Sequence, residues 1–364
     1  MKIGILTQPL CDNYGGILQN YALQIVLKKL GHKPYTIHYY KQPIKVGVVA
    51  WVKYIIKLII FHPNRKYKAH SLRNIVRRRY DGVASFCRNY IEETRPMNGI
   101  DLRNKIFKTF EAYVVGSDQV WRPKYNWLGE LYDMYLGFEQ ENHKVKKIAY
   151  AASFGVDNCE YNEEQIKRCR LLAQKFDAIS VREASGVDLC RNYLGVEAQH
   201  LLDPTLLLSA NDYRLLLQDK KFDYDGCVCV YILDMTSGKR QMVDNFCKKN
   251  NLKWFRIGAE LDNGDVPSIE SWLAGFDKAQ YVITDSFHGS VFSIIFNKPF
   301  VSIGNKDRGL SRFHSLLSIF NLEDRLVSTA DTIDHINAID WEVVNHILHQ
   351  WQQKSIAFLR NNLQ

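Results

Sequence analysis

Short apolar runs alternate with amphipathic segments along almost the whole chain. Residues 2–7 (KIGILT) are mostly apolar, which is typical of a strand buried in a sheet, and residues 17–30 have apolar positions at helical spacing up to Gly31. Further strands are expected at residues 34–40, 113–115, 147–153, 178–181, 200–202, 227–233, 254–257, 281–284 and 300–303. Further helices are expected at residues 163–175, 184–194, 239–250, 268–274, 290–297, 310–320 and 341–359. Strands separated by helices of this length pair in parallel, so the pattern predicts an α/β fold.

The alternation is interrupted at Asp203-Pro204-Thr205 and then starts again, which predicts two domains. We expect two doubly wound parallel-sheet domains that face a cleft. The first is an N-terminal α/β domain at residues 1–205, and the second is a C-terminal α/β domain at residues 206–340. Residues 341–364 form a C-terminal helix that could cross back to the first domain.

A basic insertion interrupts the first domain at residues 41–103. Residues 41–79 hold eleven Lys or Arg and no acid, whereas the formal net charge of the whole chain is +9, so the positive excess is local. Within residues 46–61 (VGVVAWVKYIIKLIIF) the only charges, Lys53 and Lys57, lie on one helical face. Such a helix can lie on an anionic membrane. It can also pack on the domain with a solvated basic face. Nucleic acid is a weaker alternative because no recognition module is present.

Length and composition limit the class of protein further. A chain of 364 residues with 46% apolar content can bury two cores. No run of 18 apolar residues lacks charges, and the first residues look like a core strand instead of a signal sequence, so we expect a cytoplasmic protein. The eight cysteines form no CxxC pair and no metal spacing, and we expect neither a metal nor a cofactor.

The most informative stretch for chemistry is residues 278–304. It is expected to be a strand, a polar turn from Asp285 to Gly289, a helix and a second strand. In open α/β sheets ligands bind beyond the carboxyl ends of strands, where the next helix offers free backbone N–H groups. Because Ser286 and His288 lie in this turn, we expect an anion site with a proton carrier beside it.

Two other polar turns follow predicted strands. The loop Asn13-Tyr14-Gly15-Gly16 replaces the GxGxxG of dinucleotide-binding proteins; it is either a tight turn with a glycine at positive φ or a loop that contacts a ligand. The turn Gly116-Ser117-Asp118 either caps a helix or directs a carboxylate into a cleft.

Four ordered motifs give the chain a family resemblance. They are NYGGILQNYALQ, VVGSDQVW, ISVRE followed by LLDPTLLL, and TDSFHGSVFSIIFNKPFV. Together they resemble the polysaccharide pyruvyl transferase family, from Lys2 to about Ser318, although residues 41–103 match no motif. The resemblance implies a fold similar to the two-domain glycosyltransferase B arrangement, with the donor bound by the second domain.

The resemblance also implies a reaction. Members of that family transfer a pyruvyl group from phosphoenolpyruvate onto two hydroxyls of a sugar, in a cell-surface polysaccharide such as a capsule or exopolysaccharide or in its lipid-linked precursor. The cleft must then supply an acid, an anion site and a group that deprotonates a hydroxyl. His288 is the expected acid or phosphate contact, unless it merely caps the helix, and Arg182 is the expected clamp for carboxylate or phosphate, unless it only pairs with Glu183.

One motif departs from the family pattern. Characterised members have Arg-Leu-His where this chain has Ser286-Phe287-His288, so a positive charge expected to hold phosphoenolpyruvate is missing. Basic residues in the next loop could replace it. Asp118 and Asp285 are candidate bases for the acceptor hydroxyl, or carboxylates that stabilise their turns. The full set of expected substrate-binding residues is Arg182, Asn13, Tyr14, Gly15, Gly16, Ser117, Ser286, Gly289, Ser290, Lys306, Arg308 and Arg312.

Three functions remain compatible with the sequence. The first is a cytoplasmic pyruvyl transferase that acts on a saccharide or lipid-linked saccharide, with the basic segment on the inner membrane face. The second is a glycosyltransferase on the same scaffold that uses a nucleotide-sugar donor. The third is a non-catalytic saccharide-binding protein. A pocket with a base-and-ribose slot would favour the second, and a pocket for a three-carbon phosphate would favour the first.

Overall fold

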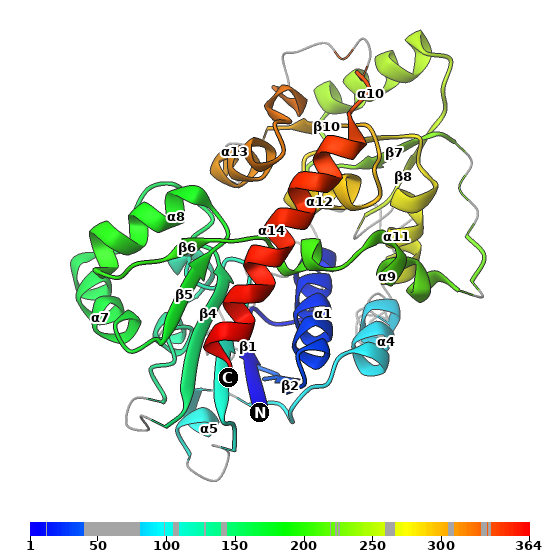
Figure 1. Cartoon of the computed structure of the whole chain (residues 1–364). Helices are drawn as coiled ribbons and strands as arrows, with labels where there is room; N and C mark the ends of the chain where they lie inside the picture. The colour runs from blue at the N-terminus through cyan, green and yellow to red at the C-terminus, as the bar shows by residue number, and fades with distance from the viewer. Residues whose placement is uncertain are drawn as a thin grey trace, which may run out of the picture.

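The computed structural model contains two parallel sheets, each covered by helices (Figure 1). It describes residues 1–11, 13–39, 81–97, 99–104, 109–126, 129–139, 144–218, 220–222, 224, 226–258, 266–304, 309–328, 333 and 336–364. The expected helix at residues 46–61 and the basic residues around it lie outside the described residues.

The first sheet has the strand order β2-β1-β3-β4-β5-β6 in the described part of the chain, and every neighbouring pair is parallel. Its strands are β1 (Lys2–Leu6), β2 (Lys33–Thr36), β3 (Ala112–Val115), β4 (Lys146–Ala152), β5 (Ala178–Val181) and β6 (Gln199–His200). Since β1 lies between β2 and β3, the strand order reverses at β1 and β3.

The second sheet has the order β11-β10-β9-β7-β8 and is also parallel throughout. Its strands are β7 (Val228–Tyr231), β8 (Trp254–Arg256), β9 (Tyr281–Thr284), β10 (Phe300–Ile303) and β11 (Leu326–Val327). Here the order reverses at β7 and β9. The two sheets confirm the expected α/β class.

The α-helices of the described residues mostly follow the expected positions. They are α1 (Tyr14–Lys29), α4 (Asp81–Tyr90), α5 (Gly99–Arg103), α6 (Glu130–Asp133), α7 (Glu163–Ala173), α8 (Ala184–Leu189), α9 (Ala210–Arg214), α10 (Ser237–Lys249), α11 (Ile269–Lys278), α12 (Phe287–Ile295), α13 (Leu310–Ile319) and α14 (Trp341–Asn362). None of these helices is both long and apolar enough to cross a membrane.

Two helices begin earlier than the sequence suggested. Helix α1 includes Gly15 and Gly16, neither of which has a positive φ, so the tight-turn interpretation of these glycines is wrong. Helix α12 begins at Phe287, which puts His288 in its first turn and not in a loop before it. Glycine and polar residues usually mark turns. In these two helices, however, Gly15 and Gly289 lie in the first turn, where a neighbouring side chain leaves no space for a Cβ.

Polar side chains inside α1 tie it to the first sheet. Gln19 donates to the hydroxyl of Thr7 at 3.0 Å, and both Asn20 and Gln24 donate to Thr36 Oγ1, at 2.7 and 2.8 Å. These amides are fully buried, and their hydrogen bonds offset the cost of desolvation. The motif NYGGILQNYALQ therefore fixes the position of α1 relative to the ends of β1 and β2.

Helix α14 runs from the second sheet back to the first (Figure 1). Ser355 Oγ accepts a hydrogen bond from the backbone N–H of Leu202 at 3.3 Å, and Gln352 donates to the backbone oxygen of Leu206 at 2.7 Å. Phe358 packs against Tyr150 of β4. The C-terminal helix therefore joins the two halves of the molecule behind the site.

Candidate active site

The two points of strand-order reversal face a shared hollow, here called the central cleft. In open parallel sheets the loops after such strands diverge and leave a crevice for ligand. The central cleft has a volume of about 510 Å³. It is lined by Gln8, Pro9, Cys11, Asn13, Gly16, Asp118, Gln119, Tyr125, Tyr231, Leu233, Asp285, Ser286, Phe287, His288 and Arg312. The loops after β1, β3, β7 and β9 all contribute, so ligand here would contact both domains.

His288 reaches from the second domain to the first. It lies in the first turn of α12, lines the central cleft and is 7% exposed. Its imidazole fills the space that a Cβ on Gly15 would occupy, so only glycine fits at that position of α1. On another side, Nε2 lies 3.7 Å from Asp203 Oδ2 and has no hydrogen-bond partner within the described residues.

Asp203 was not assigned a role from the sequence, although it lies in the quoted motif LLDPTLLL. It is fully buried, and Oδ2 accepts hydrogen bonds from Arg182 Nη1 at 2.8 Å and Ser117 Oγ at 3.0 Å. Oδ1 accepts from the backbone N–H and hydroxyl of Thr205. Burial opposes ionisation, but His288 and Arg182 outweigh it, so the pKa of this carboxyl lies well below its usual value. A permanent negative charge therefore lies beside the imidazole.

Arg182 lies behind the cleft and does not line it. Its guanidinium is 2% exposed and pairs with Asp203 and with Glu183, whose Oε1 is 3.4 Å away. The guanidinium also lies over the ring of Phe287, 4.5 Å from the centroid. Its Nη2 has no hydrogen-bond acceptor among the described residues. The geometry is that of a group that positions Asp203 and Phe287.

Arg312 supplies positive charge within the cleft wall. It lies in the first turn of α13, with its guanidinium 5.8 Å from the centroid of Phe287. Burial, together with the charge of Arg182, lowers the pKa of Arg312 to about 10, so it is charged at neutral pH. The N-terminal ends of α1, α12 and α13 all contribute residues to the cleft wall, and their dipoles add to this charge.

The two candidate carboxylates differ in their surroundings. Asp118 lies in the loop after β3, has a φ of 71° and lines the cleft. Its Oδ2 accepts a hydrogen bond from Asn13 at 3.0 Å, and its Oδ1 accepts one from the backbone N–H of Gln119 at 2.8 Å. Asp285 is 1% exposed and accepts hydrogen bonds from the backbone N–H of Leu233 and from Lys239, both at 2.6 Å. Asp285 thus holds the loop after β7 in place and is paired with Lys239, whereas the hydrogen bonds to Asp118 come from a side-chain amide and a backbone N–H.

Three further expected residues, Tyr14, Gly289 and Ser290, do not line the cleft. Tyr14 donates to the backbone oxygen of Pro267 at 2.5 Å and so connects the domains. Gly289 packs against Thr284 with no space for a Cβ, and Ser290 bonds Ser302 behind the helix at 2.7 Å. Lys306 and Arg308 lie outside the described residues.

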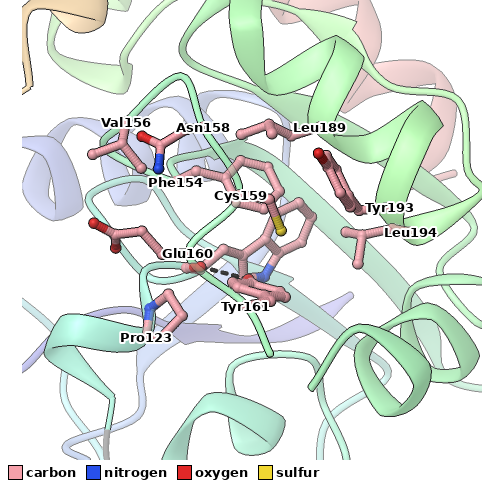
Figure 2. Close-up of a pocket in the computed structure, with 11 residues that line it drawn as sticks. Pro123, Phe154, Val156, Asn158, Cys159, Glu160, Tyr161, Leu189, Tyr193 and Leu194 are labelled. Atoms are coloured by element: carbon pink, nitrogen blue, oxygen red, sulfur yellow. Dashed lines mark hydrogen bonds between the residues drawn. The ribbon is translucent and has the colours of Figure 1, made fainter. Parts of the chain in front are cut away.

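A second pocket of the first domain is too small for a substrate (Figure 2). Its volume of about 10 Å³ matches roughly one water molecule. Tyr161 lies in its wall and donates to the backbone oxygen of Trp121 at 2.5 Å (Figure 2). This contact anchors the segment that follows Asp118. Within the described residues, no three His, Cys, Asp or Glu side chains gather into a metal site.

Replacing Gly15 by Ala should destabilise the protein although alanine favours helices. The added methyl overlaps the imidazole of His288, and overpacking of this kind costs about 1–3 kcal/mol. Gly238→Ala in α10 is the matched control, because nothing lies within 4 Å of its Cβ position. That control should gain about 0.4–1 kcal/mol. Urea unfolding measures both; a gain in stability at both positions would contradict the observed contact.

Asp203→Asn should reduce stability by about 3–5 kcal/mol at pH 7, because Arg182 loses a buried partner. The pKa of Asp203 is depressed in the folded state, so its contribution is complete above the unfolded pKa of about 4 and is lost as pH falls below it. The difference between wild type and variant should therefore shrink from pH 7 to pH 3. Asp188→Asn, at a side chain that is 70% exposed, is the control. A difference independent of pH would contradict the assignment.

Comparison with known proteins agrees with the sequence motifs. The family model for polysaccharide pyruvyl transferase matches residues 13–307. A comparison with curated proteins gave no match.

Among solved structures, the chain is similar to a UDP-GlcNAc 2-epimerase from Neisseria meningitidis bound to UDP-GlcNAc, with 8% identity, a TM-score of 0.48 and coverage of 100% of this chain and 99% of that chain. It is also similar to a UDP-GlcNAc 2-epimerase from Methanocaldococcus jannaschii, with 11% identity, a TM-score of 0.47 and coverage of 96% and 92%. We infer nothing about substrates from these likenesses. The family match, however, spans both domains and all four quoted motifs, and it includes His288, Asp118 and Asp203. The chain therefore belongs to the polysaccharide pyruvyl transferase family and is a transferase.

Proposed function

We propose that the protein transfers the pyruvyl group of phosphoenolpyruvate onto two hydroxyls of a saccharide and forms a cyclic ketal. The observation that carries this proposal is the position of His288, a proton carrier held between the domains in the wall of a cleft that Arg312 also lines. Phosphoenolpyruvate is the donor substrate, and the proposal includes no metal or organic cofactor.

The donor binds on the second-domain side of the central cleft. Phosphoenolpyruvate carries a phosphate and a carboxylate, and both favour helix N-termini and guanidinium groups. The first turns of α12 and α13 meet here, and Arg312 lies in the wall. Arg312 thereby takes the place of the Arg that other family members have where this chain has Ser286. Lys239 compensates the charge of Asp285, which would otherwise repel the donor.

The chemistry requires one proton to be given and two to be taken. His288, whose Nε2 lies 3.7 Å from Asp203 Oδ2, donates a proton to the methylene carbon, and C2 becomes an electron-deficient carbon stabilised by its oxygen. One sugar hydroxyl attacks C2 and loses its proton. The bond from C2 to the phosphate oxygen then breaks, and phosphate leaves with one of the protons that the hydroxyls release. The second hydroxyl then attacks C2, loses its proton and closes the ring. Arg312 and the helix N-termini stabilise the departing phosphate.

Asp118 is the better placed of the two candidate bases. Each oxygen of Asp118 accepts one hydrogen bond, Oδ2 from Asn13 and Oδ1 from the backbone N–H of Gln119. Asp285, in contrast, is more deeply buried and its Oδ2 is paired with Lys239 at 2.6 Å. Asp118 also comes from the first domain, opposite His288. The acid and the base therefore approach a bound donor and acceptor from different sides.

Incubation with phosphoenolpyruvate and a panel of saccharides and lipid-linked saccharides tests the proposal directly. Phosphate release that depends on acceptor is the expected result. Release of nucleotide from a nucleotide-sugar donor, with none from phosphoenolpyruvate, would show a glycosyltransferase instead. Saccharide binding without turnover of either donor would show a binding protein.

Two substitutions separate the roles in the same assay. His288→Gln keeps a polar side chain but cannot carry a proton, so kcat/KM should fall by about 10²–10⁴-fold.

Arg312→Gln loses a charged contact worth about 1.5–3 kcal/mol, so KM for phosphoenolpyruvate should rise by about 10–100-fold. Circular dichroism checks that both variants are folded. Unchanged kinetics in His288→Gln would remove the assigned acid.

We also propose that the acceptor is lipid-linked and that residues 41–79 hold the cytoplasmic protein on an anionic membrane surface. The high local basic charge supports this. Flotation with vesicles of anionic lipid should recover the protein at low salt and lose it at high salt, and neutralising Arg77, Arg78 and Arg79 should weaken recovery. Recovery that does not depend on salt or on lipid charge would contradict it.

A further inference from the structure

A second hollow adjoins the central cleft on the first-domain side, and we propose that it is the binding subsite of the acceptor saccharide. This proposal rests on the proposed function. The hollow, here called the side hollow, has a volume of about 290 Å³ and lies beyond the ends of β1 and β2. Its wall is formed by Gln8, Pro9, Leu10, Cys11, Thr36, Ile37, His38, Tyr39 and Glu93.

The side hollow and the central cleft share part of their walls. Gln8, Pro9 and Cys11 line both. The amide of Gln8 donates to the backbone oxygen of Gln119 at 3.3 Å, which holds this shared wall against the loop that carries Asp118. A molecule in the side hollow therefore lies next to the loop that carries Asp118, the carboxylate proposed to deprotonate the acceptor hydroxyl.

The lining suits an uncharged saccharide better than the donor. Leu10, Ile37 and Tyr39 give the hollow apolar surface, on which the C–H faces of a sugar ring can pack. His38 and Glu93 add polar groups, with His38 Nδ1 3.6 Å from Glu93 Oε2, and a carboxylate accepts hydrogen bonds from sugar hydroxyls. The same carboxylate would repel phosphoenolpyruvate.

Backbone hydrogen bonds hold His38 and Glu93 in place without a bound saccharide. The segment around Glu93 pairs in parallel with the end of β2, where Thr36 N–H donates to Glu92 oxygen at 2.8 Å and Thr94 N–H donates to Thr36 oxygen at 2.9 Å. The backbone N–H of His38 donates to Thr94 Oγ1 at 3.1 Å. Since these bonds fix the backbone at both side chains, binding of a saccharide would cost little ordering.

If the side hollow binds the acceptor, substitutions in its wall should change KM for the acceptor but not KM for phosphoenolpyruvate. His38→Ala and Glu93→Gln each remove a hydrogen-bonding group, worth about 3–10-fold in affinity, so KM for the acceptor should rise by that factor while KM for phosphoenolpyruvate stays unchanged. His349→Ala, at an exposed position of α14, is the matched control and should change neither. An unchanged acceptor KM, or an equal rise in both constants, would overturn the proposal.

A binding measurement separates this inference from the proposed reaction. Saturation-transfer NMR with methyl β-galactopyranoside and methyl β-mannopyranoside, without phosphoenolpyruvate, should detect at least one of them with wild type and with His349→Ala. The signal should weaken with His38→Ala and Glu93→Gln. If neither glycoside binds wild type, or if binding survives both substitutions, the subsite is wrong. If binding follows this pattern but phosphoenolpyruvate is never consumed, the subsite stands and the proposed reaction fails.

Discussion

A buried carboxylate between the two domains holds the site together. Asp203 follows β6, the last strand of the first sheet among the described residues, and it contacts Arg182 and Ser117 of the first domain as well as His288 of the second. A charge buried this deeply is tolerated only with charged and hydrogen-bonding partners around it. Because those partners come from both domains, the interaction couples the position of the imidazole to the relative position of the domains.

The close approach of the domains has a second component, which is steric. The imidazole of His288 lies against Gly15 at the start of α1, and Tyr14 next to it bonds Pro267 across the same boundary. Packing density at this contact leaves no space for even one methyl group. The two contacts place His288, the proposed acid, in the cleft wall that also holds Asp118, the proposed base from the other domain, as the proposed reaction requires.

The sequence predicted the general architecture because buried parallel strands and intervening helices leave a clear periodic signal. That His288 would line the cleft was predicted because α/β proteins bind ligands beyond the end of a strand, although His288 lies in the first turn of α12 and not in a turn before it. The helical state of Gly15 was not predicted, because the reason for glycine there is a side chain more than 270 residues away. Asp203 was overlooked for the same reason, since an Asp before Pro usually marks a turn, and only the fold shows what its second oxygen contacts. Arg182 was expected to bind ligand. The sequence around it does not show that its guanidinium is buried between Asp203 and Phe287, because both partners are distant in the chain.

The proposed reaction requires phosphoenolpyruvate to bind beside the imidazole of His288, which comes from the second domain. Long-range 1H–15N NMR of the His288 side chain, assigned by comparison with His288→Gln, measures this most directly. On titration with phosphoenolpyruvate, followed in parallel by 31P NMR, the imidazole signals of His288 should move as the donor binds. Binding of phosphoenolpyruvate that leaves those signals unchanged would contradict the account.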